Sequence, residues 1–342
     1  MQPQVTVVVV TFNSLPYLES CLASLQAQTC PLEVVIVDNA SSDGTAEFLR
    51  HSHPQKSIFN QTNVGFAAAQ NQGIRASGSP WVLTLNPDVV LDPNFVATLV
   101  DAGWQHRKAG TVCGKLLRWQ PEATKPFSNV IDSTGMYFRP DLRHLDRGGE
   151  ESDRGQYNKA EFVFGATGAA ALYRRAMIED ISINGEFFDE DFFAYREDAD
   201  LSWRAQLLGW KCLYVPQARG WHVRRVTPER RSIVPREVNW HSVKNRFLMR
   251  MKNADARLWL RFLPRILARD IAIFGYALLV DRGLFSALLY PLKNWRKIMA
   301  KRRAIQSRRR VADCQLVRWF DYRPQVESLP MISDPGLRRE AS

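Results

Sequence analysis

Three short, uninterrupted apolar runs near the N-terminus constrain the fold of this chain most strongly. They cover Val5–Val10, Val34–Val37 and Trp81–Leu85 and are rich in β-branched side chains. Runs of this length are typical of strands that are buried on both faces, as in parallel sheets. Between them, residues 18–25 carry apolar side chains at helical spacing, and the alanine-rich residues 66–76 form a second helical stretch. The alternation of strand and helix predicts an α/β fold with a mainly parallel sheet flanked by helices.

Polar side chains follow each predicted strand at its carboxyl end. In open α/β sheets these ends meet at one edge, which is where such sheets bind ligands. A turn explains any single set about equally well, because Asx, Ser and Gly residues favour turns, as in the segment DNASSDG at 38–44. Three consecutive sets together favour a ligand site. They are Thr11 and Asn13, Asp38 and Asn39, and Asn86 and Asp88.

Charge is distributed unevenly along the 342 residues. Residues 1–200 hold 16 Lys and Arg against 25 Asp and Glu, a net charge of −9, whereas residues 201–342 hold 30 against 10, a net charge of +20. An acidic and a strongly basic part suggest two roles, with an anionic partner for the second part.

The five cysteines form no CxxC pair, and the N-terminus shows no signal-peptide pattern, so we expect a cytoplasmic protein.

A cluster of carboxylates marks a second candidate region. Glu197, Asp198 and Asp200 open a predicted helix that ends near Gly209. Acidic residues in this position can simply complement the helix dipole. One of them could instead act as a general base, provided that other catalytic groups lie nearby. Residues 198 and 200 point in different directions on a helix, so they cannot act on one atom together.

Seven motifs occur in the order found in family-2 glycosyltransferases: VVVVTFNS, VDNASSDGT, NVGFAAAQNQGI, LTLNPDV, GATGAAALYRR, FDEDFFAYREDADLSWRAQLLGW and GWH. They most resemble the bacterial rhamnosyltransferase-like branch, and the resemblance covers residues 5 to about 225. It implies the A-type glycosyltransferase (GT-A) fold and transfer of a sugar with inversion at the anomeric carbon.

The resemblance also implies a site for a nucleotide-diphosphate sugar. A pyrimidine base and a ribose donate hydrogen bonds and therefore need acceptors. Asp38 matches the family's base-reading aspartate, with Thr11 and Asn13 in the same pocket. For Asn63, Gly65 and Asn71, packing and capping would explain the match nearly as well. The remaining residues expected to bind the nucleotide sugar are Asn39, Asn86 and Asp88.

A divalent cation, Mg²⁺ or Mn²⁺, is expected beside the diphosphate, because such ions share their ligands between carboxylates, phosphate oxygens and water. Asp88 is the candidate carboxylate, although the family's Asp-x-Asp is replaced by Asn86-Pro87-Asp88. His222 matches a further metal ligand of relatives; the alternative is a surface histidine. It follows a predicted strand, Cys212–Val215, that we expect to end at Pro216.

Family position implies that Asp198 is the catalytic base, which takes a proton from the acceptor hydroxyl. Glu197 and Asp200 would orient Asp198 or contact the acceptor. Gly168 in GATGAAALY would let the acceptor approach the backbone, or would only permit tight packing.

The chain divides into two predicted parts. Residues 1–235 form the GT-A catalytic domain, with donor binding in about 1–115 and acceptor binding in about 116–235, and residues 236–342 form a helical, basic region. That region contains two apolar runs too short to span a bilayer, Ile271–Val280 and Leu284–Leu292. Residues 293–310 then hold nine Lys and Arg and no acidic residue.

Apolar stretches beside a polybasic segment suit an anionic membrane surface. A solvated basic helix and a nucleic-acid-binding segment are the alternatives, and we disfavour nucleic acid. A peripheral location at the inner face of the cell membrane also suits an enzyme with a lipid-linked acceptor.

We therefore expect an inverting, metal-dependent glycosyltransferase that acts in cell-surface polysaccharide synthesis. Its expected donor is dTDP-rhamnose and its expected acceptor is a lipid-linked saccharide. Another donor, such as a UDP-hexose or UDP-galactofuranose, is the first alternative. A non-catalytic sugar-binding protein is the second.

Overall fold

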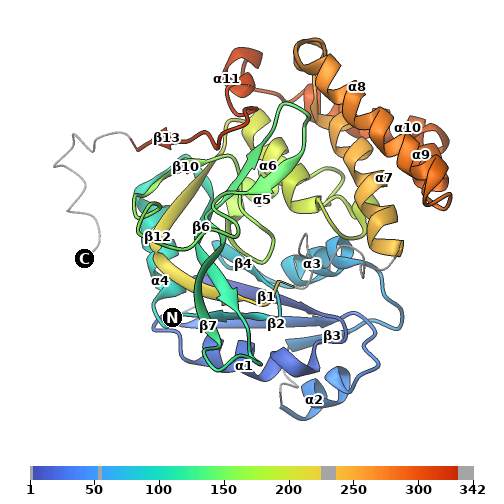
Figure 1. Cartoon of the computed structure of the whole chain (residues 1–342). Coiled ribbons are helices and arrows are strands. Elements are labelled where there is room, and N and C mark those ends of the chain that lie inside the picture. Colours follow the sequence, from blue (N-terminus) through green and yellow to red (C-terminus); the bar gives the residue numbers. More distant parts are fainter. Residues whose placement is uncertain (1–2, 53–55, 225–235, 330–342) are drawn as a thin grey trace.

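The computed structural model describes residues 3–52, 56–224 and 236–329 (Figure 1). The domain boundary expected at residue 235 lies outside the described residues.

The N-terminal strands form the parallel part of the central sheet. β1 (Val5–Thr11) lies between β2 (Leu32–Asp38) and β4 (Trp81–Leu85), and β2 pairs in turn with β3 (Ser57–Phe59), all in parallel orientation. The last residues of β1 and β2 are aligned, so their polar carboxyl ends lie side by side. The three predicted strands and the α/β fold are confirmed.

The second part of the sheet is mixed. β11 (Ala170–Arg174) runs antiparallel between β4 and β6 (Ala109–Trp119), and β12 (Lys211–His222) lies parallel to β6. Shorter strands pair antiparallel to this part or form the separate β8–β9 hairpin. They are β5 (Val89–Leu91), β7 (Phe127–Ser133), β8 (Met136–Phe138), β9 (His144–Asp146), β10 (Glu161–Val163) and β13 (Glu327–Ser328).

One strand prediction is wrong. The strand expected to end at Pro216 continues as β12 to His222. Its pairing with β6 shifts register between Tyr214 and Arg219, and this irregularity accommodates a proline that cannot donate a ladder hydrogen bond. The extension matters because it carries His222 to the strand end beside β5.

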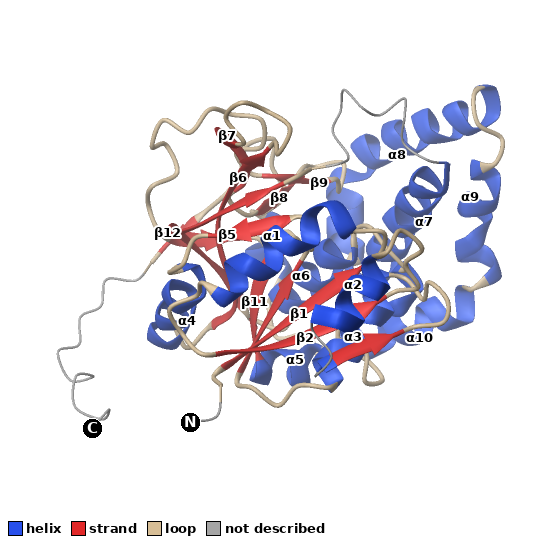
Figure 2. Cartoon of the chain, turned by 90° about the horizontal axis from the view of Figure 1, so that it is seen from below, coloured by secondary structure: helices blue, strands red, loops and turns tan. Residues whose placement is uncertain are grey.

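Helices cover both faces of the sheet (Figures 1 and 2). Val5, Val7 and Val9 of β1 face the side of α1 (Leu15–Gln26) and α4 (Phe95–Gln105), whereas Val8 faces the opposite side. This alternation follows from the two-residue period of a strand. The helices on the opposite side are α3 (Phe66–Arg75), α5 (Arg175–Ile181) and α6 (Glu197–Leu207). The short helix α2 (Thr45–Ser52) contacts α1 and β3.

The region after residue 235 is helical, as expected, and packs on the catalytic part. Leu248, Phe262 and Ile298 are buried in the same hydrophobic core as Leu201 and Trp203 of α6. None of the helices that the structure describes combines the length and apolar character needed to cross a membrane. The helices are α7 (Arg236–Asn253), α8 (Ala256–Leu279), α9 (Leu284–Lys293), α10 (Trp295–Gln306) and α11 (Asp313–Val317).

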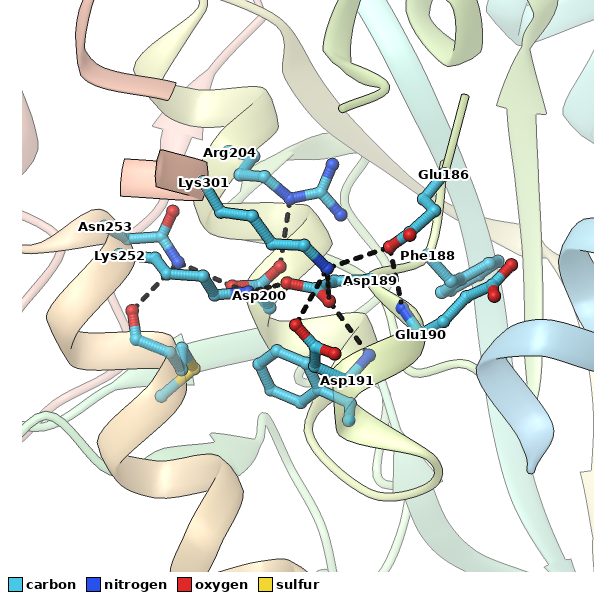
Figure 3. A network of polar contacts seen from close by, with 12 residues as sticks. Glu186, Phe188, Asp189, Glu190, Asp191, Asp200, Arg204, Lys252, Asn253 and Lys301 are labelled. Atoms are coloured by element: carbon cyan, nitrogen blue, oxygen red, sulfur yellow. Dashed lines mark hydrogen bonds and ion pairs between the residues drawn. The ribbon is translucent and has the colours of Figure 1, made fainter. Parts of the chain in front are cut away.

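A buried network of charges joins these helices to the segment that leads into α6 (Figure 3). Asp189, which is 2% exposed, pairs with Lys252 of α7 and with Lys301 of α10, the latter at 2.5 Å. Lys301 also lies 2.9 Å from both Asp191 and Glu186. Burial by itself raises the pKa of Asp189, but the two lysines outweigh it and hold that pKa well below its ordinary value.

We expect Asp189→Asn to lower the free energy of unfolding by about 3 kcal/mol, because two buried ammonium groups lose a shared carboxylate. The pKa of Asp189 is depressed in the folded state, so its contribution is complete above the unfolded pKa and is lost as the pH falls. The difference between wild type and variant in urea unfolding should therefore shrink below about pH 4.

Glu327→Gln provides a matched control, because Glu327 also lies between two cations, Lys211 and the 49%-exposed Arg318. An exposed group of this kind should change stability by less than about 1 kcal/mol. An equal decrease in the free energy of unfolding in the two variants would contradict the larger stabilisation expected from the buried network.

Candidate active site

The turn after β2 is organised by its own side chains. Asp38 accepts hydrogen bonds from the Thr11 hydroxyl at 2.9 Å and from the Ser41 amide and hydroxyl at 3.1 and 2.6 Å. Asn13 accepts one from the Ser42 amide at 2.8 Å. The turn interpretation of DNASSDG therefore holds, and these contacts join the ends of β1 and β2. The nucleotide-binding roles of Thr11, Asn13 and Asp38 stay predictions.

A cleft of about 340 Å³ opens beside this turn, where the ends of β1, β2 and β4 meet the start of α6. A larger hollow of about 690 Å³ near α1 and the β6–β7 turn contains none of the predicted site residues. The cleft brings together eight of them. They are Asn39, Asn63, Asn86, Asp88, Gly168, Glu197, Asp198 and His222.

Two buried side-chain oxygens in this cleft have no hydrogen-bond partner among the residues that the structure describes. They are Oδ1 of Asn86 and Oε2 of Glu197. Buried polar atoms in proteins are almost always hydrogen-bonded, because leaving one unpaired costs about 1–3 kcal/mol. Two unsatisfied side-chain oxygens in one cleft are expected of a site that receives hydrogen bonds or a cation from a ligand.

His222 lies between two carboxylates. Its Nδ1 is 2.8 Å from Asp132 Oδ2, and its Nε2 is 3.5 Å from Asp88 Oδ1. Burial by itself lowers the pKa of His222, but Asp132 and Asp88 outweigh it and raise that pKa to about 10. The surface-histidine alternative is wrong, since His222 is buried.

These residues fit a divalent cation as partial ligands. A metal-bound histidine commonly donates its second ring N–H to a carboxylate, which is the position of Asp132 relative to His222. No group of three or more His, Cys, Asp or Glu side chains that could hold a metal ion occurs among the described residues. Asp88 and His222 could therefore supply two ligands, and the oxygens of a diphosphate and water would have to supply the rest.

Asp198 is fixed at the cleft by backbone donors. Its Oδ2 accepts a hydrogen bond from Gly168 N at 3.0 Å, and its Oδ1 accepts one from Ala199 N at 2.7 Å. Burial raises the pKa of Asp198, although the Gly168 hydrogen bond opposes this. Burial and the neighbouring Asp198 raise the pKa of Glu197 well above its ordinary value. A carboxylate with a raised pKa is a better proton acceptor near pH 7.

The stretch before α6 adopts an unusual backbone. Phe193, Tyr195 and Arg196 have φ values of 64°, 70° and 71°, which non-glycine residues rarely adopt. The Asn245 amide of α7 donates to three main-chain carbonyls of this stretch, at 2.9, 2.8 and 2.7 Å. Arg196 is in turn hydrogen-bonded to the carbonyl and hydroxyl of Ser242. Helix α7 therefore fixes the approach to Glu197 and Asp198.

Six predicted site residues do not line the cleft. Thr11, Asn13 and Asp38 belong to the turn beside it, and the other three have structural contacts of their own. Asp200 is fully buried and bonded to Arg204 and Asn253, so its expected contact with the acceptor is corrected. The side-chain amide of Asn71 bonds to both main-chain groups of Phe188 and holds the segment before α6. Gly65 has a φ of 90°, and a Cβ there would lie 2.6 Å from the Phe193 ring, which favours the packing explanation.

Sequence reasoning missed Asp132 and Asn245. Asp132 lies in β7 and Asn245 lies in the basic C-terminal region, and both are outside the family motifs. Each contacts the site across 50 residues or more of sequence. No local pattern could have identified them.

Comparison with known proteins decides the class of this site. Residues 6–182 match the profile of Glycosyl transferase family 2. The chain is also 30% identical over 245 residues to the N-acetylglucosaminyl-diphospho-decaprenol L-rhamnosyltransferase of Mycobacterium tuberculosis (strain ATCC 25618 / H37Rv), which covers 63% of this chain and 75% of that protein. The chain belongs to glycosyl transferase family 2. The expected inverting glycosyltransferase activity is therefore confirmed at the level of the family.

A second family-2 relative is the poly-beta-1,6-N-acetyl-D-glucosamine synthase of Staphylococcus epidermidis. It is 24% identical over 214 residues, which cover 61% of this chain and 47% of that protein.

Solved structures confirm the GT-A fold of this family-2 enzyme. GalNAc-T7 with UDP, GalNAc and Mn²⁺ aligns with a TM-score of 0.57 at 16% identity, covering 73% of this chain and 48% of that one. S. aureus TarS 1-349 in complex with UDP aligns with a TM-score of 0.52 at 18% identity, covering 89% and 90%.

Proposed function

We propose that this glycosyltransferase moves L-rhamnose from dTDP-rhamnose to a lipid-linked saccharide, in the synthesis of a cell-surface polysaccharide. The supporting observation is the composition of the cleft, which brings Asn86, Asp88 and His222 together with Glu197 and Asp198. The choice of sugar and acceptor is supported by the mycobacterial relative, whose name specifies an L-rhamnosyl group and a diphospho-decaprenol acceptor. A UDP-hexose or UDP-galactofuranose donor is the alternative.

Each side of the cleft has its own role in this proposal. Residues 1–115 bind the donor, and residues 116–235 bind the acceptor. Asp198 takes the proton of the acceptor hydroxyl as that oxygen attacks the anomeric carbon. The bond from this carbon to the diphosphate oxygen breaks, and the diphosphate leaves with the electron pair. The Gly168 amide and Glu197 keep the Asp198 carboxylate aimed at the acceptor side.

A divalent cation would assist the departure of the diphosphate. Mg²⁺ or Mn²⁺, when bound, neutralises charge that develops on the leaving group. Asp88 and His222 would hold the ion, with Asp132 fixing the ring orientation of His222. The nitrogen ligand favours Mn²⁺ over Mg²⁺.

A panel of donors tests the proposed specificity and metal dependence together. Binding of dTDP-rhamnose, UDP-glucose and UDP-galactofuranose is measured by calorimetry, with Mn²⁺, with Mg²⁺ and with excess chelator. We expect saturable binding of dTDP-rhamnose that is tightest with Mn²⁺ and is weakened by chelator. If a UDP sugar binds more tightly than dTDP-rhamnose, the proposed donor is wrong. If donor binding is unchanged in excess chelator, the proposed role of the metal is wrong.

Replacing the proposed base separates chemistry from donor binding. Asp198→Asn should reduce turnover by about 10²–10⁴-fold, because a general base contributes this much. Donor affinity should stay within a few-fold of wild type, since Asp198 acts on the acceptor. Single-turnover rates and calorimetry on the same preparation measure the two quantities. A variant that retained more than a tenth of the turnover would rule out Asp198 as the base.

We also propose that the enzyme attaches peripherally to the inner face of the cytoplasmic membrane. Large apolar side chains gather on the outer surface of α8 and α9, including Leu279 at 83%, Ile271 at 69% and Leu292 at 69% exposure. Clusters of exposed apolar side chains of this kind mark interaction surfaces. Two exposed cations, Arg282 in the turn between these helices and Lys293 at the end of α9, would contact anionic head groups.

The contacts of the basic run 293–310 make it a weaker candidate for membrane binding than the sequence suggested. Several of its nine cations pair with acidic residues of the catalytic part, so they stabilise the fold rather than face a membrane. These are Lys297 with Asp191, Lys301 with Asp189, and Arg308 and Arg310 with Asp180. The apolar surface of α8 and α9 is therefore the better target for a test.

The double variant Leu278→Glu, Leu279→Glu should lose most of its sedimentation with vesicles that contain phosphatidylglycerol. Both side chains are exposed, so the thermal unfolding midpoint should not change. Ala123→Glu with Thr124→Glu adds the same charge at the exposed β6–β7 turn and should sediment like wild type. Equal sedimentation of all three proteins would refute attachment through α8.

A further inference from the structure

A second cavity, of about 450 Å³, lies between α7, α8 and α9. Its polar lining includes three arginines, Arg196, Arg246 and Arg269, and among the described residues no carboxylate lines it. Its apolar lining comes from side chains such as Ile273 and Leu284. A cavity lined by both cations and aliphatic groups is suited to a ligand that has an anionic and an apolar part.

The positive charge of this cavity is poorly compensated within the described residues. Arg246 is 2% exposed, and its Nε has no hydrogen-bond partner. Its nearest carboxylate, Asp270, lies 3.5 Å away but accepts both guanidinium hydrogen bonds of Arg250, at 3.0 and 2.9 Å. Burial and the neighbouring Arg250 and Arg196 lower the pKa of Arg246 to about 9. A bound anion would relieve this repulsion.

The other two arginines also have capacity for a ligand. Arg269 has a buried Nε without a partner, and its guanidinium forms no ion pair with the described residues. Arg196 bonds to Ser242 and His144 and likewise forms no ion pair in the described part of the chain. Burial, with Arg269 among its neighbours, lowers the pKa of Arg196 to about 10. Guanidinium groups of this kind bind phosphate oxygens in pairs.

We propose that this cavity binds the diphosphate and the first isoprenoid units of a lipid-linked acceptor. The arginines would pair with the diphosphate, and the aliphatic wall would contact the start of the lipid chain. This inference rests on the proposed function, because it supplies a site for the lipid carrier of the same acceptor. The remaining lipid chain would leave the cavity past Tyr276, which lines it and is 48% exposed on the apolar surface of α8.

The cavity is adjacent to the catalytic cleft along the chain. Arg196 lines the second cavity, here called the arginine cavity. Its neighbours Tyr195 and Glu197 line the catalytic cleft. The left-handed backbone at Tyr195 and Arg196 turns consecutive side chains toward the two cavities. A sugar attached to a diphosphate beside Arg196 would therefore extend toward Glu197 and Asp198.

Direct binding of farnesyl diphosphate tests the proposal without donor or turnover. Calorimetry should show saturable binding that is at least about tenfold tighter than that of farnesol or of inorganic pyrophosphate, because both parts of the ligand contribute. Arg269→Gln should weaken the binding by about tenfold, since a charge-assisted hydrogen bond is lost. Ile273→Glu, which places a negative charge on the apolar wall, should abolish it.

Two controls locate the ligand. Arg261→Gln removes the same charge from an exposed position of α8 outside the cavity, and Asp88→Ala alters the donor cleft. Both should bind farnesyl diphosphate like wild type. Equal affinity of Arg269→Gln and wild type would overturn the proposal, and so would loss of binding in Asp88→Ala, which would place the ligand in the donor cleft. Pyrophosphate binding as tight as farnesyl diphosphate would overturn the lipid part.

The test of the arginine cavity can fail or succeed independently of the proposed function. Sensitivity of farnesyl diphosphate binding to Arg269→Gln supports the cavity even if no donor of the panel is transferred. Transfer to a lipid-linked acceptor with an unchanged KM in Arg269→Gln would instead support the proposed function and overturn the cavity.

Discussion

The buried pairing of Asp189 with Lys252 and Lys301 is the interaction on which the arrangement of the active site depends. It ties the segment before α6 to α7 and to α10 at once, in a place where neither partner reaches water. A buried carboxylate and two buried ammonium groups are each unfavourable alone, so the three are stable only together. The helical region after residue 235 is therefore part of the catalytic unit, although it lies outside the family-2 match.

This attachment explains how the enzyme holds a strained backbone beside its proposed base. Three non-glycine residues with positive φ between 193 and 196 are each unfavourable by about 1–3 kcal/mol, and such conformations persist only where the surroundings hold them. Asn245 and Ser242 supply that restraint from α7. The backbone that they hold aims Glu197 and Asp198 into the catalytic cleft and Arg196 into the arginine cavity.

The sequence predicted the parts of the molecule that depend on short-range patterns. The strands β1, β2 and β4 followed from apolar runs, and the gathering of Asn86, Asp88, Asp198 and His222 in one cleft followed from family motifs. Contacts between residues far apart in the sequence could not be predicted. Asp132 reaches His222, and Asn245 reaches the stretch before α6, through tertiary packing that no local spacing encodes. Asp200 was misplaced for the same reason, because its partner Asn253 comes from α7.

The uneven charge of the chain has a structural explanation in these contacts. The acidic first part and the basic second part pair with each other, as Lys301 does with Asp189 and Arg310 with Asp180. Much of the basic charge is therefore an internal complement to the catalytic part. Arg269, which forms no ion pair within the described part of the chain, and the incompletely paired Arg246 differ from this pattern of pairing. Because buried charge is retained only where something compensates it, these arginines are the positions at which an anionic ligand would complete the fold as well as the site.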